Sequence, residues 1–293
     1  MQRFLSIGFI LLLAVVLNAC GNPEAGETKA NDASDKNTVD DRWTEIKESG
    51  ELVVGTSGTL IAASFYDGEE ETEDQLTGYE VETMKEIADR LDLEINFEII
   101  GVDNVSPAIK SGRIDISTGG ITDRRKEEFE FSEPIKYSFV TMAVRKDDNS
   151  GIEELEDLKG KKAGGGATTI YSQIAEQYGA EVITYGNAPN EAYLRDVDNG
   201  RTDVVINDYY LTKFGVAAFP DFDIHLHPTL NFHPTESGVM MPKGEETMKE
   251  EIDKVISDMH EDGTLSELAK EFYEEDASVK PDKEIIEVDG LDI

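Results

Sequence analysis

Apolar and polar residues follow one another along this chain in blocks that predict strands and helices in turn. Residues 52–55 form a continuous apolar run, which is typical of a buried strand. Residues 81–91 place apolar side chains at every third or fourth position, as an amphipathic helix does. Residues 94–100 then alternate like a strand with one buried face. The order strand, helix, strand predicts an α/β domain with parallel strand pairing.

A short pattern occurs twice and indicates a duplicated topology. Residues 112–116 read Gly-Arg-Ile-Asp-Ile, and residues 200–204 read Gly-Arg-Thr-Asp-Val. In both copies a helical pattern ends at the glycine, which suits the left-handed position after a helix, and an apolar run follows. The shared context predicts two domains of the same topology that face each other.

The residues after the first copy predict a helix start that carries unusual charge. Thr122 is suited to cap a helix that begins at Asp123, so Arg124 and Arg125 would lie in its first turn. The positive end of the helix dipole disfavours cations there, which is reason to expect a bound anion. The alternative is a solvated helix end whose arginines pair with nearby glutamates.

A glycine-rich segment at 163–169 offers a second place for an anion. Its sequence, Ala-Gly-Gly-Gly-Ala-Thr-Thr, precedes a helical pattern at 170–178. It does not fit the spacing of a nucleotide-binding loop, but free backbone N–H groups and the hydroxyls of Thr168 and Thr169 could hold an anion. A close-packed turn without any ligand explains the glycines equally well.

The first 20 residues predict export and lipidation. Arg3 precedes an apolar stretch at 4–17 that is too short to span a membrane, and Leu-Asn-Ala-Cys-Gly follows at 17–21. This resembles a lipobox, with residues 1–19 as signal peptide and a lipid such as palmitate on Cys20. Cys20 is the chain's one cysteine, so an intrachain disulfide is impossible. The alternative is an ordinary secretory signal. Residues 20–41 are polar and predict a flexible tether.

Charge narrows the possible partners. The chain has 293 residues, 63 acidic and 27 basic, and a formal net charge of −36. This argues against nucleic acid and anionic membrane surfaces as direct partners. The acidity suits a saline or alkaline exterior, or simply a very soluble protein. Residues 276–293 are mostly acidic and read as a loosely attached tail.

Several motifs, taken in order, resemble bacterial extracellular solute-binding proteins of family 3, the amino-acid receptors of ABC importers. They span residues 42–275 and are Leu-Val-Val-Gly-Thr at 52–56, Leu-Thr-Gly-Tyr-Glu-Val-Glu at 76–82, Ile121-Thr122 with Arg125, Phe-Ser-Glu-Pro at 131–134, Gly200 with Asp203, and Glu-Asp-Gly-Thr-Leu at 261–265. The segments at 167–171, 193–197 and 207–210 look most like the cystine-binding lipoproteins of Gram-positive bacteria.

The resemblance implies a two-lobe, periplasmic-binding-protein-like fold of type II with two crossovers and the ligand in the interlobe cleft. Lobe 1 would comprise residues 42–143 plus 238–275, and lobe 2 residues 144–237. Closure on the ligand would be a hinge motion.

The resemblance also assigns site residues. Arg125 matches the arginine that binds the ligand carboxylate, and Asp208 matches the aspartate that binds its amine. Asp208 could equally be a helix N-cap, or both. The other expected ligand-binding residues are Thr168, Thr169, Gly120, Thr118, Ser117, Leu60 and Ser57. Leu60 stands where the family has an aromatic wall, the segment 115–122 is two residues shorter than usual, and Ala167 replaces a usual glycine.

The implied function is a monomeric, lipid-anchored receptor on the outer face of a Gram-positive cell membrane. It would deliver a polar zwitterionic amino acid, L-cystine or a related sulfur amino acid, to the ABC permease subunits without a cofactor or catalysis. Three alternatives stay open: a dehydratase-like exported enzyme of the same fold, a sensory receptor without transport, and a metal receptor using His225 and His227. Exposed histidines without a bound metal explain the last pair equally well.

Overall fold

The computed structural model describes residues 41–68, 70–185, 188–288 and 290–291. The predicted signal peptide, Cys20 and the tether up to residue 40 lie outside the described residues. Among the described helices, none has the length and apolar character needed to cross a membrane.

The first half of the described unit is built on three parallel strands. β1 (Glu51–Thr56) pairs with β5 (Glu94–Ile99) on one side and with β6 (Ile116–Gly120) on the other. Two helices connect them, α2 (Tyr79–Arg90) between β1 and β5 and α3 (Val105–Lys110) between β5 and β6. The predicted strand, helix, strand order with parallel pairing is therefore confirmed.

The second half repeats this arrangement. β9 (Lys162–Gly165) lies between β10 (Glu181–Thr184) and β11 (Val204–Asp208), again parallel to both. Helix α5 (Ile170–Gln177) connects β9 to β10, and α6 (Asn190–Asp198) connects β10 to β11. The two halves have the same topology, as the repeated Gly-Arg-x-Asp pattern predicts.

The two aspartates of that pattern do the same work in both halves. The Asp115 carboxylate accepts a hydrogen bond from the backbone N–H of Val53 at 2.8 Å and pairs with the guanidinium of Arg42. The Asp203 carboxylate accepts from the backbone N–H of Lys162 at 2.9 Å and pairs with Arg145. Each aspartate thus ties the start of its strand to the strand beside it.

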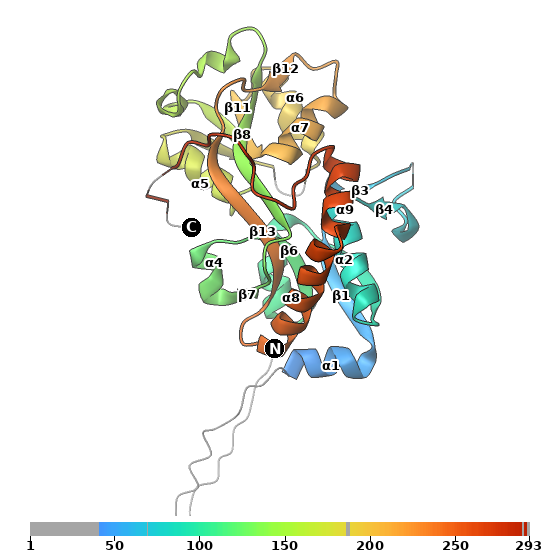
Figure 1. The fold of residues 1–293 in the computed structure, drawn as a ribbon. Coiled ribbons are helices and arrows are strands. Elements are labelled where there is room, and N and C mark those ends of the chain that lie inside the picture. The colour runs from blue at the N-terminus through green and yellow to red at the C-terminus, as the bar shows by residue number, and fades with distance from the viewer. Residues whose placement is uncertain (1–40, 69, 186–187, 289, 292–293) are drawn as a thin grey trace, which may run out of the picture. The chain divides into compact units, whose positions relative to one another are not determined.

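Two long antiparallel strands join the halves. β8 (Lys136–Arg145) and β13 (Phe232–Pro242) lie side by side in the middle of one mixed sheet of order β10-β9-β11-β8-β13-β6-β1-β5. In Figure 1 they run together from the α6 and α7 end of the described unit to the α8 and β7 end. This is the two-lobe, type II arrangement with two crossovers, and the predicted fold class is confirmed. The exact lobe boundaries stay a prediction.

The remaining elements cover the sheet or extend its edges. They are α1 (Asp41–Ser49), β2 (Thr59–Leu60), β3 (Ser64–Tyr66), β4 (Leu76–Thr77), α4 (Asp123–Glu128), β7 (Phe129–Phe131), α7 (Tyr209–Ala218), β12 (Ile224–Leu226), α8 (Glu246–Glu261), α9 (Thr264–Tyr273) and four short 3₁₀ turns at Glu73–Gln75, Val102–Asn104, Asn149–Gly151 and Leu155–Leu158.

The described residues form two large apolar clusters. Tyr79 on α2 and Tyr273 on α9 are fully buried in the first, with their ring centroids 5.0 Å apart. Ile174 on α5 and Phe232 on β13 are fully buried in the second. The first cluster also includes Tyr210 and Leu211 of α7, and the Tyr210 ring stacks on that of Tyr273 with centroids 4.5 Å apart, so this core continues beyond the first half of the sheet.

The C-terminal segment is not the loose tail that its composition suggests. Ala277 is fully buried and its carbonyl accepts a hydrogen bond from the backbone N–H of Tyr137 at 2.8 Å. Farther on, the N–H of Ile286 donates to the carbonyl of Asn231, and Val288 is buried in the core of the second lobe. Backbone pairing and apolar contacts hold this segment, although most of its residues are polar.

Candidate functional site

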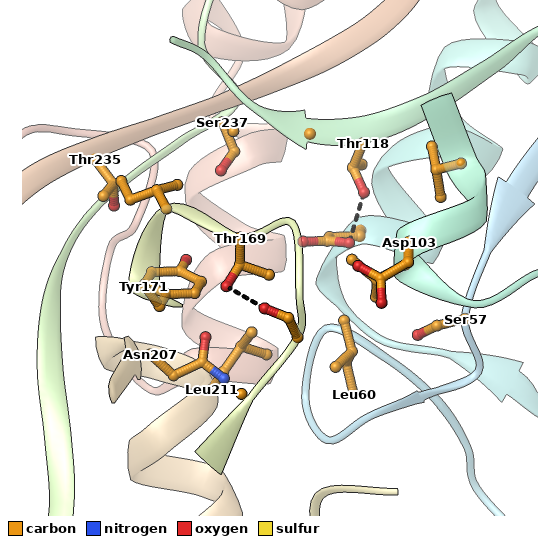
Figure 2. A pocket seen from close by; sticks show the side chains of 18 of the residues that line it. Ser57, Leu60, Asp103, Thr118, Thr169, Tyr171, Asn207, Leu211, Thr235 and Ser237 are labelled. Atoms are coloured by element: carbon orange, nitrogen blue, oxygen red, sulfur yellow. Dashed lines mark hydrogen bonds between the residues drawn. The ribbon is translucent and has the colours of Figure 1, made fainter. Parts of the chain in front are cut away.

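A cavity of about 460 Å³ lies between the two lobes. Its lining includes Ser57, Leu60 and Thr118 from the first lobe and Thr169 and Tyr171 from the second. In Figure 2 these side chains face one another across the same space. The volume is in the range of pockets that enclose a small molecule.

Most of the site residues expected from the sequence lie in this lining, and two do not. Those that line the cavity are Arg125, Thr169, Gly120, Thr118, Ser117, Leu60 and Ser57. Thr168 and Asp208 are not among the lining residues. The fold therefore gathers the expected residues from both lobes, while their contacts with a ligand stay a prediction.

Arg125 reaches the cavity from the start of α4. The Thr122 side chain caps this helix by accepting a hydrogen bond from the Arg125 backbone N–H at 3.2 Å, as predicted. The guanidinium donates only a long hydrogen bond of 3.4 Å, from Nη1 to the Gly120 carbonyl. No carboxylate of the described residues lies within ion-pair distance of it. Burial lowers the pKa of Arg125, while the nearby Tyr171 opposes this shift and the Arg124 charge adds to it. Arg125 is thus a partly desolvated cation that forms no ion pair with any of the described residues.

The glycine-rich segment supports the opposite wall. Thr169 caps α5 by accepting a hydrogen bond from the Ser172 backbone N–H at 3.3 Å, so the start of this helix points toward the cavity lining. Thr168, in contrast, donates from Oγ1 to Oδ1 of Asp103 at 2.6 Å. Asp103 belongs to the first lobe and borders the cavity, so this hydrogen bond connects the two lobes at the edge of the cavity.

Asp208 lies at the N-terminus of α7, and the helix-cap interpretation is confirmed. Its Oδ1 accepts hydrogen bonds from the backbone N–H groups of Tyr210 and Leu211 at 3.0 and 3.3 Å. Its Oδ2 lies 3.4 Å from Nζ of Lys136. The aspartate is only 2% exposed, and Lys136 is 4% exposed. From the sequence we expect Asp208 to bind the amine of a ligand. In the structure, its carboxylate already lies beside the Lys136 cation.

Sequence reasoning assigned no role to several polar residues of the lining. Glu80, Lys136, Tyr171 and Asn207 all border the cavity. Glu80 Oε2 accepts a hydrogen bond from Thr118 Oγ1 at 2.6 Å. Burial raises the pKa of Tyr171 well above its ordinary value, and the negative charges of Asp208 and Glu80 raise it further. Glu80 lies in the Leu-Thr-Gly-Tyr-Glu-Val-Glu motif at 76–82, and this motif could have indicated from the sequence that Glu80 belongs to the site.

The family is decided by comparison with known proteins. The family model for bacterial extracellular solute-binding proteins, family 3, matches residues 52–275. The chain belongs to this family. A probable ABC transporter extracellular-binding protein, YckB of Bacillus subtilis, is 43% identical over 96% of this chain and 95% of that protein. The L-cystine-binding protein TcyA of the same organism is 30% identical over 95% of this chain and 100% of that one.

Solved structures of family 3 proteins and their relatives share the fold. The crystal structure of YckB from Bacillus subtilis has a TM-score of 0.67 at 45% identity and covers 84% of this chain and 99% of that one. An ancestral amino-acid-binding protein, AncCDT-1, described as a precursor of cyclohexadienyl dehydratase, has a TM-score of 0.69 at 26% identity, over 78% and 98% of the two chains. The resemblance to family 3 solute-binding proteins that the sequence motifs indicate is therefore confirmed.

One departure of this family 3 protein from the usual pattern is visible in the cavity. Leu60 lines the space, as expected for an aliphatic wall, whereas Phe65 and Tyr66 are not among the described lining residues. Aromatic surface comes instead from the second lobe, where Tyr171 and Tyr193 border the cavity. The apolar part of a ligand would therefore meet leucine on one side and tyrosine on the other.

The histidine pair does not form a metal site. His227 Nδ1 accepts a hydrogen bond from the backbone N–H of Leu230 at 3.1 Å, and its Nε2 lies 2.9 Å from the carbonyl of Ile152. Both ring nitrogens are therefore in use, and no lone pair is free for a metal. His225 Nε2 lies 2.9 Å from Oδ1 of Asn149. The described residues contain no group of three or more metal-ligating side chains.

Proposed function

We propose that this protein is the substrate-binding component of an amino-acid ABC importer and that its ligand is L-cystine or a related polar amino acid. The observation that carries the proposal is the guanidinium of Arg125, which lines the interlobe cavity without an anionic partner among the described residues. The family match and the name of the relative TcyA support the ligand class.

Arginine is suited to this role because its planar guanidinium can bind both oxygens of a carboxylate at once. An unpaired cation in a partly desolvated position costs folding free energy, so its presence there is explained by a ligand anion that compensates it. Thr169 and the N-terminus of α5 approach from the other lobe, which would let both lobes contact the same carboxylate.

Cystine suits the polar and apolar parts of the lining. Hydroxyl groups of Ser57, Ser117 and Thr118 border one part of the cavity. Leu60 and Tyr193 border it as well and offer apolar surface for a disulfide and its methylene groups. A second, non-sulfur amino acid of similar polarity would use the same groups, so the ligand has to be identified by measurement.

The test is titration calorimetry of the purified protein with the twenty amino acids and L-cystine. We expect one ligand with a Kd of about 1 μM or lower, corresponding to about −8 kcal/mol. L-cystine should bind at least ten times more tightly than most of the panel. A protein that binds none of these compounds contradicts the proposal.

We further propose that Cys20 carries a lipid that holds the protein on the outer face of the cell membrane, where it would meet the permease subunits. The support is the lipobox-like sequence at 17–21. In cells that express the full chain, wild type should sediment with membranes, and Cys20→Ala should appear in the culture medium. A wild-type protein that is fully released would show that the anchor is wrong.

We propose binding without turnover. The relationship to AncCDT-1, described as a precursor of a dehydratase, is the reason to test it. Nuclear magnetic resonance spectra of the bound amino acid, recorded after a day with the protein and again after release, should be identical to those of the starting compound. A new product that depends on the protein would make the exported enzyme the better interpretation.

A further inference from the structure

We propose that the C-terminal segment, through the backbone of Ile286, positions the wall that β13 gives to the cavity and thereby sets the affinity for the ligand. This inference rests on the proposed function, in which the cavity holds an amino acid. None of the segment's described residues lines the cavity, so its effect is exerted through β13. The family model ends at residue 275, before the part of the segment that contacts this wall.

The segment follows the two crossover strands into the second lobe. In Figure 1 it is dark red and crosses β8 and β13 after leaving α9. Lys283 Nζ lies over the rings of Phe139 on β8 and Tyr209 on α7, at 4.5 and 4.8 Å from their centroids. Val288 is buried in the apolar cluster of the second lobe, together with Phe232. The segment is therefore anchored on both sides of its contact with β13.

Ile286 holds the start of β13 through its backbone. Its N–H donates to the carbonyl of Asn231 at 3.0 Å, and its carbonyl accepts from the N–H of His233 at 2.7 Å. The two hydrogen bonds bracket Phe232, which pairs with Ile286 in the parallel direction and is fully buried. The side chain of Ile286 is 46% exposed, so the contact depends on its backbone groups.

His233 has a backbone conformation that needs such support. Its φ of 47° lies in the left-handed region, which is uncommon for a residue other than glycine. The pairing of β13 with β8 also shifts its register between Phe232 and Pro234, so the regular ladder does not hold this residue. Strained conformations persist only where the surroundings determine them. The hydrogen bond from the His233 N–H to Ile286 supplies that determination.

The side chains of this wall do not fix its shape. His233 and Thr235 both line the cavity, and Figure 2 shows Thr235 at its border. His233 Nδ1 and Thr235 Oγ1 are buried and have no hydrogen-bond partner among the described residues. A slip of the strand by one residue would turn both side chains to the other face. The contact with Ile286 therefore protects the position of two lining residues.

The segment also balances a charge at this wall. Glu236 lines the cavity, and its Oε1 lies 3.1 Å from Nζ of Lys280. Both side chains are exposed enough that the ion pair adds little stability. The lysine nevertheless offsets a negative charge that would repel the carboxylate of an amino acid. The shape and the charge of the wall thus both depend on the C-terminal segment.

The experiment compares the full-length protein with three variants. Ile286→Pro removes the N–H that bonds to Asn231, and Ile286→Val keeps it. The matched control is Ile285→Pro, since the backbone groups of adjacent residues in an extended segment point to opposite sides. Calorimetry with L-cystine gives the Kd, and calorimetric unfolding gives the Tm without ligand. Nuclear magnetic resonance at fixed pH gives the ring signals of His233, which are identified by their absence in His233→Asn.

We expect Ile286→Pro to raise the Kd for L-cystine by about 3- to 10-fold, because losing one hydrogen bond lowers the fraction of molecules with the binding-competent wall. It should also shift the His233 ring signals. Ile286→Val and Ile285→Pro should keep the wild-type signals and a Kd within about twofold of wild type. If Ile286→Pro does not fold, Val288→Ala, which loosens the anchor beyond the contact, should raise the Kd in its place.

A wild-type Kd in Ile286→Pro, even with a lower Tm, would make the segment purely structural and overturn the proposal. An equal loss of affinity in Ile285→Pro would overturn it as well, because the effect would not come from the contact with β13. If wild type binds neither L-cystine nor any other amino acid, the proposed function fails. The His233 signals then decide the positioning by themselves, and signals that stay in place in Ile286→Pro would refute it.

Discussion

Arg125 gives the clearest opportunity to separate ligand binding from stability. Its guanidinium borders the cavity, burial lowers its pKa, and it has no carboxylate partner among the described residues. In the unliganded protein this cation is a cost, and in the complex it is the main partner of the carboxylate. Replacing it by glutamine should therefore stabilise the unliganded protein and destabilise the complex with the ligand.

The magnitude follows from the contacts that a carboxylate would make. Two charge-assisted hydrogen bonds are worth about 1.5 kcal/mol each, so Arg125→Gln should weaken binding by about 3 kcal/mol, or roughly 150-fold. Ligand at 1,000 times the wild-type Kd stabilises wild type by about 4 kcal/mol. At the same concentration the variant should gain only about 1 kcal/mol.

Thermal unfolding with and without ligand is the assay. For a unit of this size, about 1 kcal/mol corresponds to a change in Tm of roughly 2–4 °C. Ligand should therefore raise the Tm of wild type by about 8–16 °C and that of Arg125→Gln by about 2–4 °C. Without ligand, the Tm of the variant should equal or exceed that of wild type, because the unpaired cation is gone.

The control is Arg124→Gln, which removes the neighbouring arginine on the exposed side of α4. It should keep the full ligand-induced increase in Tm. A variant at Arg125 that keeps the wild-type increase, or that loses several kcal/mol of stability without ligand, would refute the reasoning. The first result would place the carboxylate elsewhere, and the second would make Arg125 a structural residue.

Three further outcomes test other parts of the structure. Thr168→Val removes the hydrogen bond to Asp103 across the cleft, and surface plasmon resonance should show ligand dissociation that is about two to five times faster with little change in association. Asp115→Ala removes the acceptor of the Val53 N–H and should lower the free energy of unfolding in urea by about 3 kcal/mol; a loss below 1 kcal/mol would contradict this. Burial lowers the pKa of His233 in the folded protein below its ordinary 6.5. As the pH falls, the unfolded chain therefore binds the proton at a higher pH than the folded protein does. The free energy of unfolding should decrease below about pH 6.5. His233→Asn, which tolerates the left-handed backbone there, should flatten that part of the profile in denaturation series between pH 5 and 7.5, and an unchanged slope would exclude this histidine as its source.

The sequence alone determined the features that depend on residues close together in the chain. The cap of α4 by Thr122 needs only the side chain and a backbone N–H three residues away. The duplicated glycine and aspartate of 112–115 and 200–203 identified the two lobes, since a helix end and the strand after it are both local patterns. Asp208 as a cap of α7 was open to the same reasoning.

The tertiary structure decided which charges meet. Lys136 and Asp208 lie on different strands, and only the sheet order β11-β8-β13 brings the lysine to the aspartate. Thr168 meets Asp103 although 65 positions separate them, because the lobes approach at that edge of the cavity. The C-terminal segment packs against β13 through Ile286, which its acidic composition did not indicate. Local patterns define backbone hydrogen bonds within a few residues, whereas the charge balance of a cavity depends on strands that are distant in sequence.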